Sequence, residues 1–406
     1  MNAREIKLYR KAKDFRGAAD EEKIRSQIAG IRPLRGSADP RERLNLDSTR
    51  LSLHTERVAA WRRGERIAPI TIDMALTQKC SYSCTFCYAG LQQNPSEPVS
   101  WEVYEQFLGD CAAAGVKAIS LVSDGESTEN PRYVDFIVRA KALGLDIALG
   151  TNGLKLSRLP ELLESLTYLR INFNAATPSR CAKIMGTSVA NVERVLANVR
   201  EAVRLKKERG YACTIGLQQV LLPEYADECV PLALLARDLG VDYLVVKHCS
   251  DDEQGRLGVD YGWYRSDVAR DLYRAVESLS TRETSIQVKW RKLETGNERT
   301  YSKCYGPPLF LQISGSGVVA PCGSFFHERY ADKHIGDLRR DRFRDILASE
   351  RYWAVMGHLA GPAFDPRKQC AALCLQDTVN LRLFEWVDKG VEIPQSTSAA
   401  RDANFL

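Results

Sequence analysis

Short apolar runs alternate with longer amphipathic stretches between residues 70 and 247. The apolar runs are rich in β-branched residues, and the longer stretches repeat their apolar positions with the period of a helix. We predict strands at Ile70–Leu76, Lys117–Val122, Asp146–Gly150, Tyr168–Asn174, Ala212–Leu221 and Asp242–Lys247. We predict helices at Trp101–Ala114, with Ser100 as N-cap, Tyr133–Leu143, Val189–Arg209 and Asp227–Leu239. This alternation indicates βα units, a parallel sheet and therefore an α/β fold.

The segment that precedes this region has a different pattern. Residues 1–69 are rich in Arg, Lys and Glu, with helix-like pieces at Glu21–Ile28 and Ser52–Arg63. The turn-prone residues 32–37 separate the two pieces. We expect a helical N-terminal extension that packs on the main domain.

The pattern changes again after the sixth predicted strand. A polar loop at residues 250–255 leads to a predicted helix at Tyr264–Leu279, and cysteines then return. The end of the chain, Pro394–Leu406, is rich in Ser, Ala and Asp without an apolar period, so we expect a loosely held tail. The expected domains are the extension 1–69, the α/β domain 70–260, a linker helix with a cysteine-bearing domain 261–390 and a flexible tail 391–406.

The composition of the chain indicates a soluble globular protein. At 406 residues the chain is long enough for two or three domains, and its 27% charged and 44% hydrophobic residues are typical of a soluble globular protein. The first residues lack the apolar core of a signal peptide, and no run approaches about 18 apolar residues, so we expect a cytoplasmic protein without a membrane partner. A net charge of +5 fits a solvated basic surface or an anionic substrate, and we expect no nucleic-acid partner.

Twelve cysteines in a chain of this kind favour metal binding or catalysis over disulfides. Cys80, Cys84 and Cys87 form a C-x3-C-x2-C pattern directly after the first predicted strand. A structural zinc site needs four closed ligands, whereas a four-iron cluster held by three thiolates keeps one iron for another ligand. The missing fourth cysteine therefore favours an iron–sulfur cluster.

This loop, with the aromatic Phe86 before its third cysteine, resembles the cluster loop of the radical S-adenosylmethionine (SAM) enzymes. The resemblance implies a partial (β/α)6 barrel and a 4Fe-4S cluster whose free iron is chelated by SAM. It also implies an electron donor such as flavodoxin or ferredoxin, and a 5′-deoxyadenosyl radical that abstracts hydrogen from a substrate. Parallel barrels place their chemistry after the C-terminal ends of the strands, which is where this loop lies.

The resemblance also implies contacts to SAM at successive strand ends. The turn at Ser123–Ser127 looks like a variant of the family's Gly-Gly-Glu turn, with Asp124 in place of the first glycine. Because Asp tolerates unusual backbone angles, we expect the turn to survive and Asp124→Gly to be tolerated. The candidate cofactor-binding residues are Phe86, Tyr88, Asp124, Gly125, Glu126, Asn152, Asn172, Asn174 and Gln218.

Four more cysteines lie in the C-terminal part of the chain. Cys304 and Cys322 flank a predicted hairpin with a Gly-rich turn, and Cys370 and Cys374 are expected to lie one helical turn apart on one face. The pattern resembles the twitch domain, a shortened SPASM domain, which implies an auxiliary 4Fe-4S cluster in a small α+β domain. A zinc site with the same ligands is the alternative.

Three residues after the sixth strand are candidates for contact with the substrate. Cys249 is a candidate hydrogen-atom donor, because a thiol has a weak S–H bond, or else a structural thiol. Lys247 and His248 could bind an anionic substrate, move a proton or be solvated.

Within the resembling family we expect an oxidoreductase or epimerase that acts on a small polar metabolite, such as a sugar, an aminocyclitol or a nucleotide-linked sugar. The auxiliary cluster favours dehydrogenation, and a thiol donor would favour epimerisation. One alternative is a maturase of ribosomally made peptides, against which residues 1–69 lack the strands of a winged-helix peptide-binding element. The other is a non-catalytic iron–sulfur or zinc redox sensor.

Overall fold

The computed structural model describes residues 18–31, 49–91, 98–252, 254–296, 298–370, 372, 374–394 and 401–406. The strands of these residues form one ten-stranded sheet in the order β10-β9-β8-β1-β2-β3-β4-β5-β6-β7. Neighbours from β1 to β7 are all parallel. The strands are β1 Thr71–Met74, β2 Ala118–Leu121, β3 Asp146–Thr151, β4 Tyr168–Asn172, β5 Thr214–Leu221, β6 Tyr243–His248, β7 Ser285–Val288, β8 Phe310–Ile313, β9 Val318–Ala320 and β10 Gly336–Asp337.

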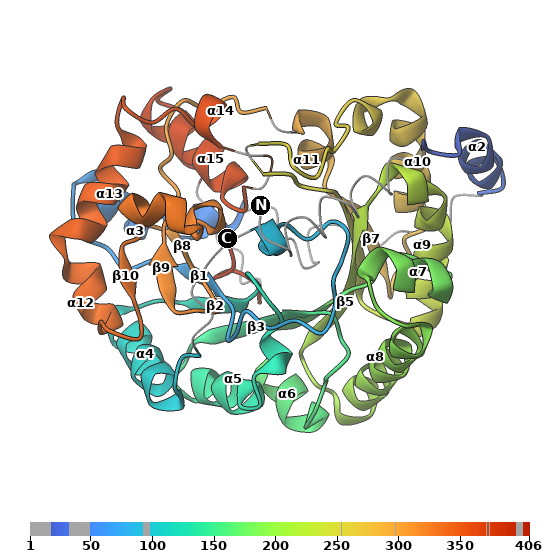
Figure 1. Cartoon of the computed structure of the whole chain (residues 1–406), viewed down its shortest axis with the longest axis horizontal. Coiled ribbons are helices and arrows are strands. Elements are labelled where there is room, and N and C mark those ends of the chain that lie inside the picture. The colour runs from blue at the N-terminus through green and yellow to red at the C-terminus, as the bar shows by residue number, and fades with distance from the viewer. Residues whose placement is uncertain are drawn as a thin grey trace.

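Helices form an outer ring around the strands, which curve into a partial barrel (Figure 1). The expected α/β fold and six βα units are confirmed. The surrounding helices are α4 Trp101–Ala114, α5 Tyr133–Ala142, α6 Leu159–Ser165, α7 Pro178–Met185, α8 Val189–Arg209, α9 Cys229–Leu239 and α10 Asp267–Glu277. No helix among the described residues is long and apolar enough to cross a membrane.

Local sequence explains where these helices begin and end. Ser100 caps α4, since its hydroxyl accepts a hydrogen bond from the backbone N–H of Val103 at 3.4 Å. Ser188 caps α8 in the same way through the N–H of Asn191. Gly115 ends α4 with a φ of 87°, a left-handed conformation that suits glycine.

The sheet continues beyond the six predicted strands at both of its edges. The unpredicted strand β7 pairs parallel with β6 and adds one more strand to the barrel. At the other edge, the expected hairpin β8–β9 is present, and β8 pairs parallel with β1. The hairpin that carries the C-terminal cysteines therefore extends the barrel sheet. It is followed by α12 Phe343–Ala348, α13 Glu350–Ala360, α14 Pro366–Gln369 and α15 Asp377–Val387, and α11 Trp290–Thr295 lies after β7.

The two predicted N-terminal helices are present on different sides of the molecule (Figure 1). Helix α2, Glu21–Ala29, lies beside α10, and Lys23 contacts the carboxylate of Asp227 at 2.5 Å. Helix α3, Thr55–Arg62, lies beside the start of the sheet, where Arg57 donates to the carbonyl of Ala68 at 2.6 Å. The predicted turn at 32–37 is outside the described residues.

Asp402, Phe405 and Leu406 are buried, so the expectation of a loosely held tail is wrong for residues 401–406. Phe405 is 2% exposed and packs edge-on against Tyr168 of β4, with ring centroids 5.1 Å apart. Asp402 pairs with Arg50 at 2.9 Å, and the carbonyl of Asn404 accepts from the hydroxyl of Thr71 at 2.6 Å. The segment closes the N-terminal end of the barrel because Phe405 fills the space between the strands.

Candidate functional site

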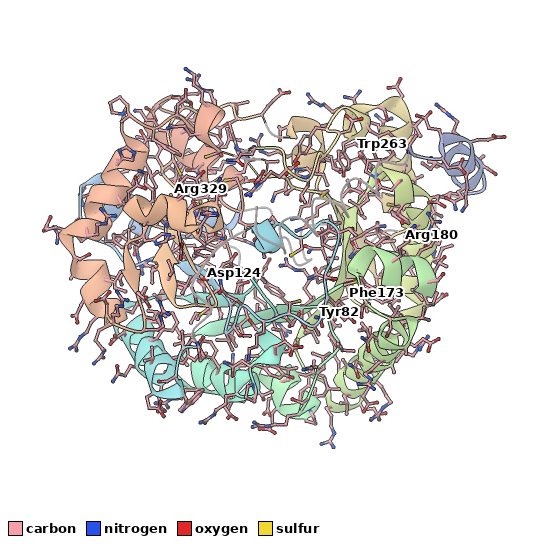
Figure 2. The ribbon with its side chains drawn as sticks, viewed as in Figure 1. Tyr82, Asp124, Phe173, Arg180, Trp263 and Arg329 are labelled. Carbon is pink, nitrogen blue, oxygen red and sulfur yellow. The ribbon has the colours of Figure 1, made fainter. Side chains whose placement is uncertain are left out.

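A cavity of about 1070 Å³ opens at the C-terminal ends of the barrel strands. Its wall is formed by the cysteine loop at residues 76–89, the turn after β2, and residues of β3, β4, β5 and β6. Pockets that hold cofactors and small molecules commonly measure about 300–1,000 Å³, so this one has room for more than one ligand. Figure 2 shows Tyr82 and Asp124 inside the ring of helices and Arg180 at its outer edge.

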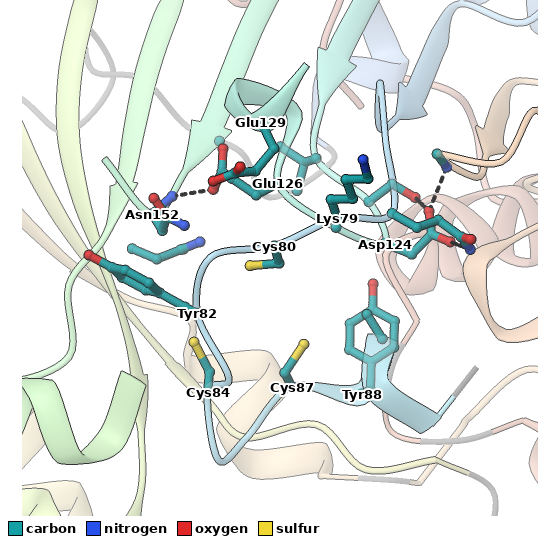
Figure 3. A pocket seen from close by; sticks show the side chains of 18 of the residues that line it. Lys79, Cys80, Tyr82, Cys84, Cys87, Tyr88, Asp124, Glu126, Glu129 and Asn152 are labelled. Atoms are coloured by element: carbon teal, nitrogen blue, oxygen red, sulfur yellow. Dashed lines mark hydrogen bonds between the residues drawn. The ribbon is translucent and has the colours of Figure 1, made fainter. Parts of the chain in front are cut away.

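Three cysteines turn their sulfur atoms toward one space in this cavity (Figure 3): Cys80, Cys84 and Cys87. The N–H of Cys87 donates to the carbonyl of Cys84 at 3.2 Å, which tightens the loop. The N–H and hydroxyl of Thr85 donate to the carbonyl of Ile184 at 3.0 and 3.1 Å. The loop is thereby fixed on α7 with its three thiols facing inward.

The raised pKa values of these thiols suit ligands of a positively charged iron–sulfur core. Burial raises the pKa of Cys80 to about 12 and holds the pKa of Cys84 well above its ordinary value. The thiolate form of each cysteine is further disfavoured by the negative charge of its neighbours. Bound iron would compensate this repulsion, because metal ions stabilise coordinating thiolates. The donor set and its electrostatics therefore suit a 4Fe-4S cluster.

The turn after β2 lies against the cysteine loop, as the resemblance implied. Gly125 has a φ of +121°, and a Cβ atom there would lie 2.1 Å from the carbonyl oxygen of Thr77, so only glycine fits. The N–H of Glu126 donates to the carbonyl of Lys79 at 2.9 Å. The Glu126 carboxylate accepts hydrogen bonds from the hydroxyl of Thr151 at 2.8 Å and the N–H of Asn152 at 2.6 Å. This carboxylate joins the loops after β2 and β3 (Figure 3).

Asp124 has a role that its sequence context did not indicate. Its carboxylate accepts hydrogen bonds from the amide of Gln78 at 2.9 Å, the hydroxyl of Ser314 at 2.6 Å and the N–H of Gly315 at 2.8 Å. Among described non-glycine residues only Arg158 has a positive φ, so residue 124 does not need the backbone freedom of glycine. The expectation that Asp124 merely replaces a glycine is therefore wrong, because its carboxylate connects the turn to the β8–β9 hairpin.

The other candidate SAM contacts divide into two groups. Asn172 and Gln218 line the cavity and contact each other, with the Gln218 amide donating to Asn172 at 2.7 Å. Asn152 also lines it, and its amide donates to the hydroxyl of Ser81 at 3.3 Å. Asn174 instead is 1% exposed, is not among the lining residues, and accepts from the N–H of Val220. Its contacts hold the strand ends together, so the structure does not place Asn174 at the cavity.

The two aromatic candidates and Cys249 also differ in position. Phe86 and Tyr88 line the cavity, and burial raises the pKa of the Tyr88 hydroxyl. Cys249 is 2% exposed and is not among the lining residues, although Lys247 and His248 are. Its Sγ lies 3.9 Å from the carbonyl of Ser250, and burial raises its pKa. The described geometry therefore gives its thiol no direct path to a substrate.

The four C-terminal cysteines share one neighbourhood. Burial holds the pKa of Cys304 well above its ordinary value, and the nearby charges of Cys370, Cys374 and Cys322 raise it further. Cys370 follows the end of α14 in extended conformation, with φ −108° and ψ 149°. The expected helical turn from Cys370 to Cys374 is therefore wrong, because the helix ends before it.

Helix α15 holds the start of this cysteine group in place. The side-chain oxygen of Asn380 accepts from the N–H groups of Tyr305 and Gly306 at 2.7 and 2.8 Å. Gln376 donates to the carbonyls of Phe310 and Pro321 at 2.6 and 2.7 Å. Across the described residues, no three Cys, His, Asp or Glu side chains are close enough to hold a single metal ion. A four-iron cluster takes ligands that are spaced more widely than those of one ion.

Sequence reasoning missed Arg170, which lines the cavity from the middle of β4. Its neighbour across the barrel is Asp73, a buried residue of β1 that is opposite Ser120 and Gln312 in the sheet. Burial raises the pKa of Asp73 to about 7, and the charge of Arg170 and hydrogen bonds from Ser120 and Gln312 lower it. Polar residues at alternate positions of otherwise apolar strands were the available signal.

The comparisons agree with this geometry. Residues 74–232 match the family model described as the Radical SAM superfamily. The tungsten-containing aldehyde ferredoxin oxidoreductase cofactor-modifying protein of Pyrococcus furiosus is 21% identical over 69% of this chain and 81% of its own length. The AdoMet-dependent heme synthase of Methanosarcina barkeri is 24% identical over 69% of this chain and 82% of its own.

A solved structure has a similar fold. SuiB of Streptococcus suis, bound to S-adenosylmethionine, superposes with a TM-score of 0.57 over 75% of this chain and 72% of that one, at 14% identity. The same protein bound to its precursor peptide SuiA gives a TM-score of 0.56.

Proposed function

Residues 74–232 form a radical SAM domain, and from this premise we propose that the protein oxidises a small polar metabolite at the cavity of the barrel. A 4Fe-4S cluster and SAM are the cofactors of this domain. We assign Cys80, Cys84 and Cys87 as the cluster ligands, and the convergence of their three sulfur atoms is the observation that carries the proposal. When bound, the cluster and SAM supply reductive cleavage of SAM and abstraction of a hydrogen atom from a C–H bond.

The residues of the chain hold and orient the cofactors. The turn at residues 123–126 would receive the amino group of SAM on its backbone carbonyls, as the family resemblance implies. Asn152, Asn172 and Gln218 provide amides for the polar parts of SAM. Phe86 and Tyr88 lie beside the cysteines and limit the access of water.

We assign Cys304, Cys322, Cys370 and Cys374 as ligands of an auxiliary 4Fe-4S cluster. Four thiols can occupy all four irons, which leaves such a cluster suited to accept an electron rather than to bind substrate. That supports dehydrogenation as the outcome. Epimerisation through Cys249 is less well supported, because its thiol is not among the groups that line the cavity.

A peptide substrate is the second candidate, favoured by the similarity of the fold to SuiB, which was solved with its precursor peptide. Residues 18–31 and 49–69 contain helices and no strand, so the described part of the N-terminal region lacks the strands of a winged-helix peptide-binding element. This favours the small metabolite.

The test is metal content and SAM cleavage in the anaerobically reconstituted protein. We expect about eight irons per chain, no stoichiometric zinc, and formation of 5′-deoxyadenosine after reduction. Replacing Cys80, Cys84 and Cys87 by Ala should leave about four irons and abolish cleavage. Cys111→Ala is the matched control, since this thiol is buried in α4 away from both cysteine groups.

Cleavage that persists in the triple variant would refute the assigned ligands. About four irons in the wild type together with one zinc would refute the auxiliary cluster.

A further inference from the structure

The wall of the cavity formed by β4, β5 and β6 carries a set of side chains that the cofactor assignment leaves unused. Arg170 projects from β4 and Lys247 and His248 from the end of β6, and all three line the cavity. Lys292 of α11 lies behind them, close enough for its charge to lower the pKa of both Lys247 and His248. We call these four residues the cationic wall: Arg170, Lys247 and His248 face the same space as the cysteine loop, and Lys292 lies behind them.

These cations lack anionic partners. None of the ion pairs among the described residues involves Arg170, Lys247 or Lys292, and Nε of Arg170 has no hydrogen-bond partner there. Burial and the positive charges of Lys292 and Arg170 lower the pKa of Lys247 to about 7. Moving the charged amine of a lysine from water into a half-buried site costs free energy, which a counter-ion normally offsets. Lys247 has cations as its neighbours and therefore lacks this compensation.

The two carboxylates nearest to this wall are already engaged. Asp73 accepts hydrogen bonds from Ser120 and Gln312, and burial raises its pKa to about 7, so a large share of it is uncharged near neutral pH. Asp377 accepts from the hydroxyl of Tyr301 at 2.9 Å and pairs with Arg291 at 3.2 Å. Asp73 attracts Arg170 and Asp377 attracts Lys292 only from beyond ion-pair distance, whereas the charges that act most strongly on Lys247 are those of Lys292 and Arg170.

His248 adds a second, independent indication of a ligand. Its Nδ1 lies 2.7 Å from the backbone carbonyl of Cys249, which can only accept, so Nδ1 carries the proton. Burial lowers the pKa of the ring to about 3, so the ring is neutral and Nε2 is an acceptor. His248 is 1% exposed, and Nε2 has no hydrogen-bond partner among the described residues. A buried acceptor of this kind calls for a donor from a ligand.

The opposite side of the cavity carries the acidic groups. Glu126 and Asp124 accept several hydrogen bonds from the chain, and Glu129 pairs with Lys155 at 2.7 Å. The cavity is therefore acidic near the turn after β2 and basic near β4 and β6. An anion would be drawn to the basic side.

We propose that the cationic wall binds an anionic polyol, whose phosphate or carboxylate lies against Arg170 and Lys247 while one of its hydroxyls donates to Nε2 of His248. The ligand is the substrate of the reaction, and in that respect the inference rests on the proposed function. The anionic group and the hydroxyl would fix the orientation of the substrate beside the cysteine loop. An uncharged sugar would leave the cations without a counter-ion, and an unmodified apolar peptide side chain would leave both the cations and Nε2 of His248 unsatisfied.

The test uses the full-length, anaerobically reconstituted protein with SAM bound and three probes: ribose 5-phosphate, gluconate and uncharged ribose. We expect ribose 5-phosphate or gluconate to bind at least about tenfold more tightly than ribose in calorimetry, with affinity that falls as salt rises. Absence of binding by both anions would overturn the proposal. This comparison needs only the wild-type protein.

Variants then locate the site. Lys247→Met should weaken binding of the anion about tenfold or more, and Lys207→Met, on the exposed side of α8, should leave it unchanged. His248→Leu should weaken binding of ribose 5-phosphate but not of inorganic phosphate, because phosphate alone does not use the acceptor. Equal losses in the Lys247 and Lys207 variants would overturn the assignment.

The carboxylate of SAM is the other possible source of the anion. If Lys247→Met weakens SAM binding in parallel with anion binding, the cations serve the cofactor and the proposal fails. Unchanged SAM affinity supports the substrate. Formation of 5′-deoxyadenosine without substrate reports on the proposed function separately, so anion binding that persists in a protein unable to cleave SAM would refute the function and retain the site.

Discussion

At the scale of the residue, Asp124 shows how one carboxylate can join two parts of the protein. It is 3% exposed, and the donors to its carboxylate include Gln78 of the cysteine loop and Ser314 and Gly315 of the turn between β8 and β9. A buried carboxylate with several donors is stable only while the donors remain, and each donor left unpaired costs about 1–3 kcal/mol. The conformation of the turn that would hold SAM thus depends on the hairpin.

We expect Asp124→Gly to lower both the free energy of unfolding and the affinity for SAM, the latter about tenfold. Ser314→Ala should give a smaller loss of the same kind, because it removes one of the hydrogen bonds and leaves the carboxylate. Urea unfolding and equilibrium dialysis with SAM measure the two quantities. Wild-type affinity in Asp124→Gly would restore the view that this position only needs backbone freedom.

Cys249 provides the second prediction at this scale. Because its thiol is 2% exposed and does not line the cavity, we expect Cys249→Ala to yield the same oxidised product as the wild type. Turnover of an anionic polyol in heavy water, followed by mass spectrometry, is the measurement, with buried Cys213→Ala as control. One solvent deuterium at the abstracted carbon of the wild-type product, absent in Cys249→Ala, would establish the thiol as hydrogen donor.

At the scale of the element, the backbone after Cys304 is held by α15, a helix that lies far from Cys304 in the chain. Asn380 of α15 is 1% exposed and binds two consecutive backbone N–H groups directly after Cys304. It fixes the direction in which the chain leaves Cys304. The helix therefore acts as a support for the auxiliary site.

Asn380→Ala should release Cys304 and reduce the iron content from about eight to about four per chain, with SAM cleavage retained. Asn380→Asp keeps the acceptor oxygen and should retain more of the iron. Iron analysis together with electron paramagnetic resonance of the reduced protein distinguishes the two clusters. Full iron content in Asn380→Ala would show that the backbone around Cys304 needs no such support.

Most elements followed from the sequence, and the exceptions have physical reasons. Strands β1 to β6 were predictable from their apolar, β-branched runs. Helices α4 and α8 were predictable because their apolar positions repeat with a helical period over many residues and because the capping serine directly precedes each helix. Pairing of β8 with β1 was not, because residues about 240 positions apart carry no local signal of contact. The helical turn expected at Cys370 failed because spacing alone does not report where α14 ends.

In the site, too, features set by neighbouring residues were predictable from the sequence and features set by distant residues were not. The three cysteines of the first loop form a local motif, so their convergence was predictable. The engagement of Asp124 and Asn174 by distant backbone groups was not.

At the scale of the whole molecule, the segment 401–406 lies inside the ring of helices (Figure 1), against the N-terminal ends of the barrel strands. Phe405 packs with Ala118, Ala148 and Tyr168, which belong to three neighbouring strands. Burial of one such aromatic ring typically contributes about 1.5–3 kcal/mol. The segment is thus part of the core.

We expect Phe405→Ala to lower the free energy of unfolding by about 3 kcal/mol, through lost contacts and the cavity left behind. Val391→Ala is the control, because Val391 is 49% exposed and its truncation should have little effect. Urea unfolding of both variants measures the difference. Equal stability of the two variants would mean that the segment adds nothing to the fold.

The pairing of β8 with β1 has a consequence for electron transfer. Strand β1 leads into the loop of Cys80, and the hairpin that starts with β8 leads to Cys322, so a rigid hydrogen-bonded ladder connects the two cysteine groups. Tunnelling rates fall exponentially with distance, and a fixed separation keeps the rate uniform from one turnover to the next. If the two cysteine groups hold the two proposed clusters, this ladder fixes the distance over which an electron would pass between them.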